Sequence, residues 1–413
     1  MTGIGPTLVL AATTLAGCVG QSVSPSANPS VQTAEVPTVG QSATANGTPT
    51  PSPAPPTFVP IGSMTTGRMY ATATSLPNGK VLLAGGKETD GLTVTVLASA
   101  ELYDPSTGAF SPTGSMAAAR ADQTATLLPD GRVLIAGGDG CSKVASCRDA
   151  GPGSVTALAS AELYDRTTGK FTNTGSMSAP HGHAAATLLS DGRVLLVGGY
   201  GKVADVYDET TGRFTRTGDS PMDIGNGDPT ATLLANGKVL VTGMTASGPR
   251  AALYDSVSGV FTSISFPLPP GDAELMQQYS GPGPAPRRAT LLKDGRVLLY
   301  GIGYVEIFDA STGAFAPAGL IPPSALWDPT ATLLENGNVL FAGGAPVTDP
   351  NSYVPAAVVA ALYDPNGGAH AIGSMDTARD GQTATLLPDG SVLIAGGTAD
   401  GGNALSSAEL FKQ

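Results

Sequence analysis

The chain has 413 residues, carries a net charge of −12, and contains 55 Gly but only 13% charged residues. This acidic balance argues against a nucleic-acid partner, because binding to phosphates requires clustered Lys and Arg. Abundant Gly, sparse charge and the lack of an amphipathic helical pattern indicate short strands joined by turns, so we expect an all-β fold.

The N-terminus has the composition of an export signal. Residues 8–17 are apolar or small, too few to span a bilayer but suitable for the hydrophobic region of a signal peptide. The sequence LAGC at 15–18 resembles the lipobox of bacterial lipoproteins, in which the Cys, here Cys18, is acylated after cleavage. No Lys or Arg precedes Cys18, so an ordinary cleaved signal is the alternative.

Residues 19–56 are dominated by Ser, Pro, Thr, Ala and Gly, which cannot bury enough apolar surface to offset the entropy of ordering. We therefore expect a signal peptide with lipobox at 1–18, a disordered tether at 19–56 and a folded part at 57–413. The resemblance to lipoproteins implies export and a lipid anchor in the bacterial envelope or on the cell surface, with plain secretion as the alternative. The anchor is the only membrane contact that we expect.

A β-hairpin motif recurs through the folded part with a period of about 50 residues. In the copy at 125–138, ATLLPDGRVLIAGG, two apolar runs flank Asp130-Gly131 and a Gly pair follows. An Asp-Gly or Asn-Gly pair can supply the positive φ angles of a tight hairpin turn. The turn pair occurs seven times, each time followed one residue later by Val-Leu: at 78–79, 130–131, 191–192, 236–237, 294–295, 336–337 and 389–390.

Each copy continues into two further strands. After a variable loop comes an aromatic strand and turn, as in AELYDPSTG at 100–108, and then a fourth strand, as in AFSPTGSM at 109–116. Four antiparallel strands, a to d, make one sheet, and radial repetition of such sheets gives a β-propeller. The last copy stops at the c strand Ala408–Phe411. We expect Thr57–Met64 to supply its d strand and to close a ring of seven blades.

These residues resemble the kelch repeat of galactose-oxidase-like propellers: a hydrophobic strand, a Gly-Gly, a c-strand Tyr-Asp and a d-strand aromatic. Met244 and Ile302 replace the second Gly in blades four and five, and the d-strand Trp of the family is Phe here, or His370 in one copy. We expect His370 to pack beneath the outer edge in place of the Phe. The resemblance implies the fold, but kelch propellers serve both as enzymes and as interaction modules.

The variable loops should lie on one face of the propeller, because the b-c and d-a connections of a four-stranded blade emerge opposite the a-b and c-d turns. Long b-c loops in four neighbouring blades would form a wall: Ala345–Val359, Thr398–Ser407, Lys87–Ser99 and Asp139–Ser160. An insertion at 267–286 would rise opposite this wall. Function concentrates on variable loops held by a rigid scaffold, so we expect the ligand site on this face.

Two rows of residues that precede the a strands are expected to line the mouth of the central channel, because residues i and i+2 of an extended strand point to the same side. The candidate ligand-binding residues of these rows are Arg68, Arg120, Asp122, His181, His183, Asp228, Asp328 and Arg379. The three arginines come from consecutive blades, so they could converge on a carboxylate or an acidic sugar. The alternative is a solvated rim that makes structural hydrogen bonds.

Three further features have two interpretations each. His181-Gly182-His183 could chelate a metal with Asp122 or Asp228, or could be two rim residues; we assign no metal and no cofactor. Cys141 and Cys147 lie in the longest b-c loop, and in an oxidising compartment we expect them to form a disulfide. Trp327 could stack on a sugar or could cover the end of blade six.

The hypothesis that follows is a non-catalytic, surface-tethered, monomeric propeller that binds a protein or carbohydrate ligand, anionic ligands included, on the b-c and d-a face. The alternative is a carbohydrate-active hydrolase or lyase that uses rim carboxylates as acid and base. A copper-radical oxidase like galactose oxidase needs two Tyr and two His ligands, one Tyr being linked to a Cys. The chain has no such Tyr and His pairs and only Cys18, Cys141 and Cys147, so no catalytic residue is assigned.

Overall fold

The chain divides into two units, residues 1–53 and residues 54–413. The computed structural model describes residues 55–89, 93–141, 146–147, 156–199, 201–223, 229–245, 248–266, 288–301, 304–320, 326–327, 329–346, 357–399 and 402–413. All regular elements among these residues are β-strands. The described residues include no helix whose length and hydropathy would suit a membrane span.

The described residues form seven four-stranded antiparallel sheets, numbered here one to seven in chain order, together with smaller sheets in the loops. The a strands are β2 (Thr72–Ser75), β9 (Thr124–Leu127), β16 (Ala185–Leu188), β20 (Thr230–Leu233), β24 (Arg288–Leu291), β29 (Thr330–Leu333) and β34 (Thr383–Leu386). The b strands are β3 (Val81–Ala84), β10 (Val133–Ala136), β17 (Val194–Val197), β21 (Lys238–Thr245), β25 (Val297–Tyr300), β30 (Val339–Ala342) and β35 (Val392–Ala395). The c strands are β6 (Ala100–Asp104), β14 (Ala161–Asp165), β18 (Ala204–Asp208), β22 (Gly248–Asp255), β26 (Tyr304–Asp309), β32 (Ala360–Asp364) and β36 (Ala408–Lys412). The d strands are β7 (Ala109–Pro112), β15 (Lys170–Asn173), β19 (Arg213–Arg216), β23 (Val260–Ile264), β27 (Ala314–Leu320), β33 (Gly368–Ala371) and β1 (Thr57–Ile61).

The a-b hairpin forms where the sequence predicts it, although the Asp and the Gly of the turn have different roles. In sheet two Leu127 pairs with Val133, and Gly131 has a φ of 84°. Gly131 N–H donates to the Leu128 carbonyl at 2.9 Å, and the Asp130 carboxylate accepts from Arg132 N–H at 2.8 Å. Only the Gly takes the left-handed conformation, as in three-residue hairpin loops, while the Asp caps the turn.

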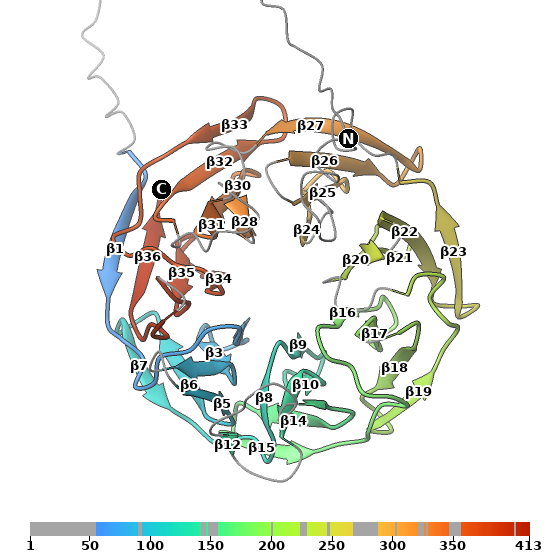
Figure 1. Ribbon diagram of the computed structural model, residues 1–413, viewed down its shortest axis with the longest axis horizontal. Helices are drawn as coiled ribbons and strands as arrows, with labels where there is room; N and C mark the ends of the chain where they lie inside the picture. Colours follow the sequence, from blue (N-terminus) through green and yellow to red (C-terminus); the bar gives the residue numbers. More distant parts are fainter. Residues whose placement is uncertain are drawn as a thin grey trace, which may run out of the picture. The chain divides into compact units, whose positions relative to one another are not determined.

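The seven sheets of the second unit lie around a common centre, with the a strands innermost (Figure 1). Each a strand contacts the a strands of the neighbouring sheets, and β2 of sheet one contacts both β9 and β34. The N-terminal strand β1 pairs antiparallel with β36, the last strand of the chain, with Phe58 opposite Phe411. Their rings lie 5.2 Å apart. This all-β arrangement is consistent with a β-propeller.

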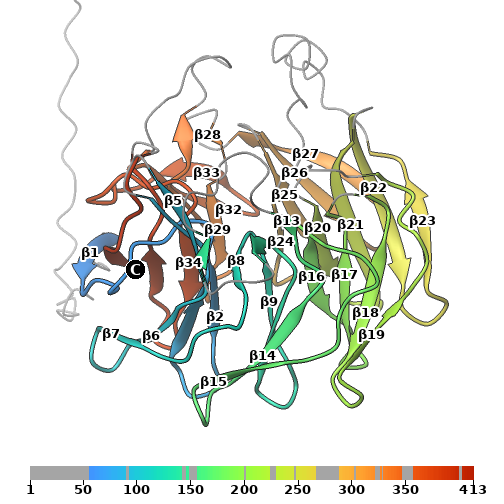
Figure 2. The same ribbon diagram turned by 60° about the horizontal axis from the view of Figure 1, so that its bottom comes forward.

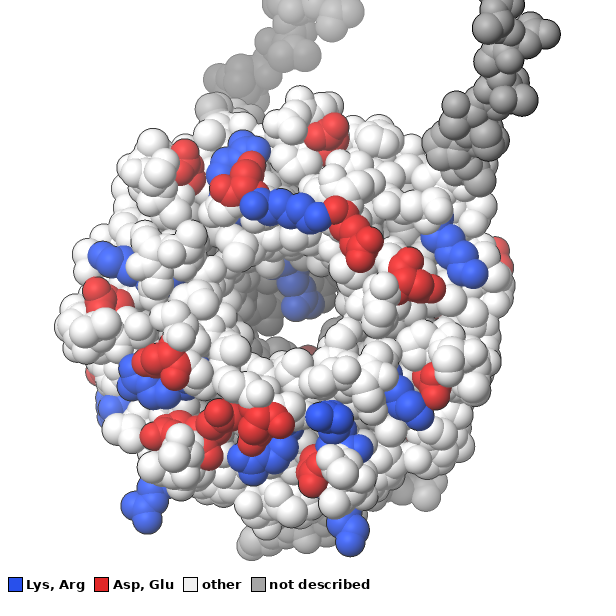
Figure 3. Space-filling model, turned by 180° about the vertical axis from the view of Figure 1, so that it is seen from behind, with Lys and Arg blue, Asp and Glu red and all other residues white. Residues whose placement is uncertain are grey.

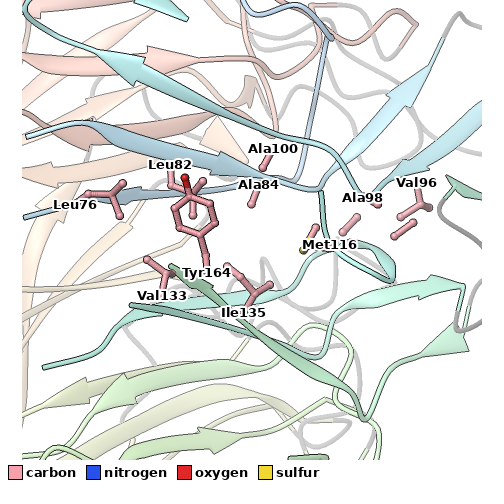
Figure 4. Packing of buried hydrophobic residues seen from close by; sticks show 12 residues of the cluster. Leu76, Leu82, Ala84, Val96, Ala98, Ala100, Met116, Val133, Ile135 and Tyr164 are labelled. Carbon is pink, nitrogen blue, oxygen red and sulfur yellow. The ribbon is translucent and has the colours of Figure 1, made fainter. Parts of the chain in front are cut away.

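The hydrophobic core lies between neighbouring sheets. Figure 4 shows the ring of Tyr164 next to Leu82 and Val133, and the Tyr164 and Leu82 side chains belong to different sheets. The Tyr164 hydroxyl is 2.9 Å from the Thr113 hydroxyl of sheet one, and the same hydrogen bond recurs at Thr174–Tyr207 and Thr217–Tyr254. Burying a side chain of this size contributes roughly 1.5 to 3 kcal/mol. The repeated c-strand Tyr therefore joins sheets as well as filling the core.

The expectation for His370 is wrong, because the strand register differs by one residue from the one assumed. Ala369 lies opposite Tyr363 in β33, at the place that Phe110 occupies opposite Tyr103 in sheet one. A shift of one residue turns a strand side chain to the other face. His370 is accordingly exposed.

The two ends of the second unit differ in character. Figure 2 shows short hairpin turns, such as those of β14–β15 and β18–β19, at one end, and β28 (Leu326–Trp327), which belongs to a d-a connection, at the other. We call these ends the turn face and the loop face. Figure 3 shows neighbouring acidic and basic side chains around the central opening of the turn face. The a-b turns contain ion pairs such as Asp191–Arg193 and Asp294–Arg296. Ion pairs as exposed as these contribute at most about 1 kcal/mol each.

Candidate functional site

The three arginines expected to bind an anion are buried inside the sheets. Arg68, Arg120 and Arg379 have exposed fractions of 2%, 0% and 0%. Each guanidinium donates to a buried c-strand carboxylate: Arg68 to Glu101 at 2.8 Å, Arg120 to Glu162 at 2.9 Å and Arg379 to Glu409 at 3.0 Å. The prediction that they line an open rim and converge on one ligand is therefore wrong.

The Arg120–Glu162 pair illustrates the structural role of these buried ion pairs. Arg120 Nη1 donates to the carbonyls of Gly137 at 2.9 Å and Ser160 at 3.0 Å. Glu162 in turn accepts from two backbone N–H groups of the d-a loop, those of Ala117 at 2.8 Å and Ala118 at 3.2 Å. Burial lowers the pKa of the Arg120 guanidinium, and the charge and hydrogen bond of Glu162 oppose this effect. The pair ties the d-a loop to the b-c loop and the c strand.

His181 takes the place of the arginine in sheet three. Its side chain is fully buried, with Nδ1 2.6 Å from the Gly198 carbonyl and Nε2 3.1 Å from Asp205 Oδ2. Burial would raise the pKa of the Asp205 carboxyl, but hydrogen bonds from His181 and Ser178 outweigh it, so the pKa lies below its usual value. Both imidazole nitrogens are engaged inside the sheet, so His181 and His183 do not form a chelating pair.

The second row of residues is partly exposed where the structure describes it, because the backbone bends at this position. Tyr70, Asp122 and His183 have φ angles of 54°, 53° and 50°. Side chains two residues apart point to the same side only in an extended chain. Because the backbone is left-handed at Asp122, the Asp122 side chain points away from the buried side chain of Arg120. Such a conformation costs a non-Gly residue of order 1 kcal/mol.

Backbone hydrogen bonds connect these bends from one sheet to the next. Tyr70 N–H donates to the Gly381 carbonyl at 2.9 Å, and Asp122 N–H donates to the Tyr70 carbonyl at 3.1 Å. Gly381 holds the equivalent position in sheet seven, with a φ of 65°. A Cβ atom on Gly381 would lie 2.9 Å from the Tyr70 ring, so Gly leaves space for this Tyr.

Five side chains gather at this point, and we call them the mouth cluster: Tyr70, Lys87, Asp122, Asp139 and His183. Lys87 Nζ is 2.7 Å from Asp122 Oδ2 and lies 5.1 Å from the centre of the Tyr70 ring. His183 Nε2 is 3.3 Å from Asp139 Oδ2 and 3.9 Å from Asp122 Oδ2. The charged side chains are partly buried, with exposed fractions of 23% for Lys87, 12% for Asp122, 15% for Asp139 and 29% for His183.

Lys87 and Asp139 were not among the residues predicted from the sequence. Lys87 directly follows Gly85-Gly86, and Asp139 directly follows Gly137-Gly138. Their strands pair with the d-a loops: Met69 bridges to Lys87, and Ala121 in β8 (Ala119–Ala121) pairs with Asp139 in β11 (Asp139–Cys141). The residue after the Gly pair thus forms a third row next to the two predicted rows. Aligning the repeats would have identified this position from the sequence.

The long b-c loops of three neighbouring sheets are joined above the mouth cluster. In sheet one the loop contains the hairpin of β4 (Lys87–Thr89) and β5 (Val94–Leu97). Strand β5 also pairs with β12 (Ser146–Cys147) from the loop of sheet two, which further contains β13 (Thr156–Ala157). Ala404 N–H of sheet seven donates to the Thr89 carbonyl at 3.2 Å. The expected wall is present over these described parts of sheets seven, one and two.

Several predicted features lie outside the described residues. They are Cys18, Asp228, Asp328 and the insertion at 267–286. The backbones of Cys141 and Cys147 are described in β11 and β12, but their side chains are not, so the disulfide stays a prediction. The same holds for the Trp327 side chain, whose backbone in β28 pairs with β31 (Ala345–Pro346).

The comparison with known proteins identifies the fold class. No family model matches the chain, and no curated protein matches it either. Solved structures do match, and they have galactose-oxidase-like and related propeller-type folds. The chain is therefore an all-β protein with a β-propeller fold.

Three of these structures span most of the chain. A fungal alcohol oxidase of the AA5 family, in complex with copper, is 15% identical, covers 86% of this chain and 76% of its own, and has a TM-score of 0.65. A streptogramin B lyase is 13% identical, with coverages of 86% and 97% and a TM-score of 0.57. YjhT is 12% identical, with coverages of 85% and 96% and a TM-score of 0.51. At these identities the likeness shows the fold alone.

Proposed function

We propose that this chain is a non-catalytic, envelope-tethered binding protein. In this proposal the seven sheets are the blades of a kelch-type propeller, β1 closes the ring, and residues 1–56 export and tether it. A protein or glycan ligand binds on the loop face over the mouth cluster. Support for the closed ring comes from the β1–β36 pairing and from the contact between β2 and β34.

The observation that carries the binding proposal is the mouth cluster itself. It gathers carboxylates, an ammonium group and an imidazole in partly exposed positions, next to loops that are joined across three sheets. Donors and acceptors at this spacing suit the hydroxyl groups of a sugar or the polar groups of a protein surface. The buried arginines are already paired with glutamates, so they do not enter this proposal.

A hydrolase or lyase is the second candidate, and one contact favours it. His183 Nε2 lies 3.3 Å from Asp139 Oδ2, and a carboxylate that orients an imidazole can support general base catalysis. A copper-radical oxidase is not proposed, because the mouth cluster offers a single Tyr, Tyr70, and a single His, His183.

Binding is tested with glycan and peptide arrays probed with the full-length chain, followed by titration of the strongest hit. Asp122→Asn and His183→Asn should each weaken the hit at least about tenfold, as expected for the loss of a hydrogen bond to a charged group. Asp294→Asn is the matched control, because Asp294 pairs with Arg296 at 2.7 Å and is 48% exposed, but it lies in an a-b turn at the opposite end of the sheets. If Asp122→Asn and His183→Asn both bind the hit as the wild type does, the ligand does not bind at the mouth cluster. If the chain converts a hit into a product, the hydrolase or lyase is favoured.

A further inference from the structure

We propose that Asp122, Asp139 and His183 bind a divalent transition-metal ion, of which Zn²⁺ is the best probe. Each residue offers one ligand atom, and the three atoms lie within 4.8 Å of one another. The distances from His183 Nε2 are 3.3 Å to Asp139 Oδ2 and 3.9 Å to Asp122 Oδ2. This inference goes beyond the proposed function and holds whether or not the mouth cluster also binds a glycan or a protein.

The two separations from His183 fit a metal ion with little rearrangement, and the third, between Asp122 and Asp139, is at most 4.8 Å. Two ligand atoms that each lie about 2.1 Å from a tetrahedral ion are about 3.4 Å apart. The His183–Asp139 distance already matches this value, and the His183–Asp122 distance exceeds it by about 0.5 Å, within reach of a small rotation of the Asp122 side chain. Three protein ligands also leave a coordination position for water or for a ligand of the loop face.

The donor set selects the class of ion. Imidazole nitrogen suits Zn²⁺ and other transition metals, while Mg²⁺ and Ca²⁺ prefer sites made of oxygen alone. One imidazole with two carboxylates is therefore a site for Zn²⁺ or Mn²⁺ rather than for Ca²⁺. The inference differs from the His181–His183 chelate considered from the sequence, because His181 is buried against Asp205.

The three ligands come from separate segments that the fold holds together. Asp122 and His183 stand in the d-a loops before β9 and β16, and Asp139 begins β11. Asp139 pairs with Ala121 across β8 and β11, and the neighbouring Gly138 N–H donates to the His181 carbonyl at 2.8 Å. Ligands on a hydrogen-bonded framework lose little entropy when an ion binds.

Lys87 makes the proposal specific. Its ammonium group is 2.7 Å from Asp122 Oδ2, so it competes with a metal ion for this carboxylate. Without the lysine the cluster would hold two carboxylates and an imidazole with no internal cation. Lys87→Met should therefore tighten metal binding about tenfold, whereas a purely structural network of ion pairs would show no metal binding to tighten.

The experiment uses the full-length chain, stripped of metal with a chelator and with its thiols alkylated, so that Cys cannot contribute. Isothermal titration with ZnCl₂ should show one ion per chain, and titration with Co²⁺ should give the absorption bands of a low-symmetry nitrogen and oxygen site. Asp139→Asn and His183→Asn should each weaken Zn²⁺ binding at least about tenfold. The control His370→Asn removes an exposed His in β33 of sheet six, which supplies none of the three ligands, and should leave the binding unchanged.

Thermal melts keep the result interpretable if a variant is less stable. Excess Zn²⁺ should raise the melting temperature of the wild type and of Lys87→Met, because an ion that binds only the folded state stabilises it. The proposal is overturned if the wild type binds no Zn²⁺ at 100-fold excess over the protein. It is equally overturned if His183→Asn binds as the wild type does, or if His370→Asn loses as much affinity.

Discussion

Replacing Arg120 by Met should destabilise the protein strongly without acting through a ligand. Met has a similar length and leaves the apolar part of the site filled. The change removes the guanidinium that donates to Glu162 at 2.9 Å and to the carbonyls of Gly137 and Ser160. The Glu162 side chain is 2% exposed, so water cannot replace the lost partner without local opening.

The size of the effect follows from this uncompensated charge. Removing one partner of a buried ion pair costs about 3 to 5 kcal/mol. A folded unit of about 360 residues has an unfolding entropy of roughly 0.75 kcal/mol/K, at about 2.1 cal/mol/K per residue, so the melting temperature should fall by about 4 to 7 °C. The double variant Arg120→Met/Glu162→Gln should recover at least about 1 kcal/mol relative to the sum of the single changes.

Differential scanning calorimetry at one fixed scan rate measures these shifts. Arg216→Met is the matched control, because Arg216 also pairs with a carboxylate, that of Asp219 at 2.6 Å, but is 52% exposed; the melting temperature of this variant should stay within about 1 °C of the wild type. A melt of Arg120→Met that coincides with the wild type would refute the structural role. If Arg120→Met melts as the wild type does but binds an array hit more weakly, Arg120 contributes to ligand binding instead.

Three further predictions follow from the structure and the sequence. A chain that begins at residue 66 should melt below one that begins at residue 55, because it lacks β1, which pairs with β36 over five residue pairs; equal midpoints would contradict the closing role of β1. Cys18→Ser should move the chain from the membrane to the soluble fraction of its host, and a wild type that is already wholly soluble would contradict lipidation. Asp205 has a lowered folded pKa, so its contribution to stability is complete above the usual Asp value near pH 4 and is lost as the pH falls through the folded value. Melts between pH 5 and pH 2 should therefore show a weaker acid dependence for Asp205→Asn than for the wild type.

The strands of the fold could be predicted because their signals are local. Asp130-Gly131 specifies a turn by its own backbone chemistry, and Val133–Ala136 is a short apolar run of the length of a buried strand. The pairing of Thr57–Ile61 with the C-terminal strand was predictable for a different reason, since the last repeat lacks a d strand and the first segment matches one. The register of β33 was not predictable, because GAHA contains no Phe or other large hydrophobic residue to fix it.

The site was predicted less well, because one assumption about the backbone was wrong. The positions of Arg120 and Asp122 were treated as extended, so that both side chains would face the channel. With a φ of 53° at Asp122, the first residue points into the sheet and the second toward the mouth. The sequence did contain a warning: Glu162 interrupts the buried strand AELYD, and a carboxylate in such a strand requires a buried cation.

The buried ion pairs and the mouth cluster are connected through the d-a loops. Where the c-strand acid becomes Ala252 or Ala361, the d-a loop has no cationic residue at the paired position, which holds Asn226 or Leu326. In sheets four and six acid and base are thus absent together, as expected when a lone buried charge costs several kcal/mol, whereas sheet five keeps the buried acid Glu306 although Pro284 stands at the paired position. In sheets one, two and three the pair is kept, and the residue two positions after its base is Tyr70, Asp122 or His183. A d-a loop fixed from inside by its ion pair can hold the next residues in a strained conformation that a mobile loop would relax, so the buried charges position the side chains of the mouth cluster.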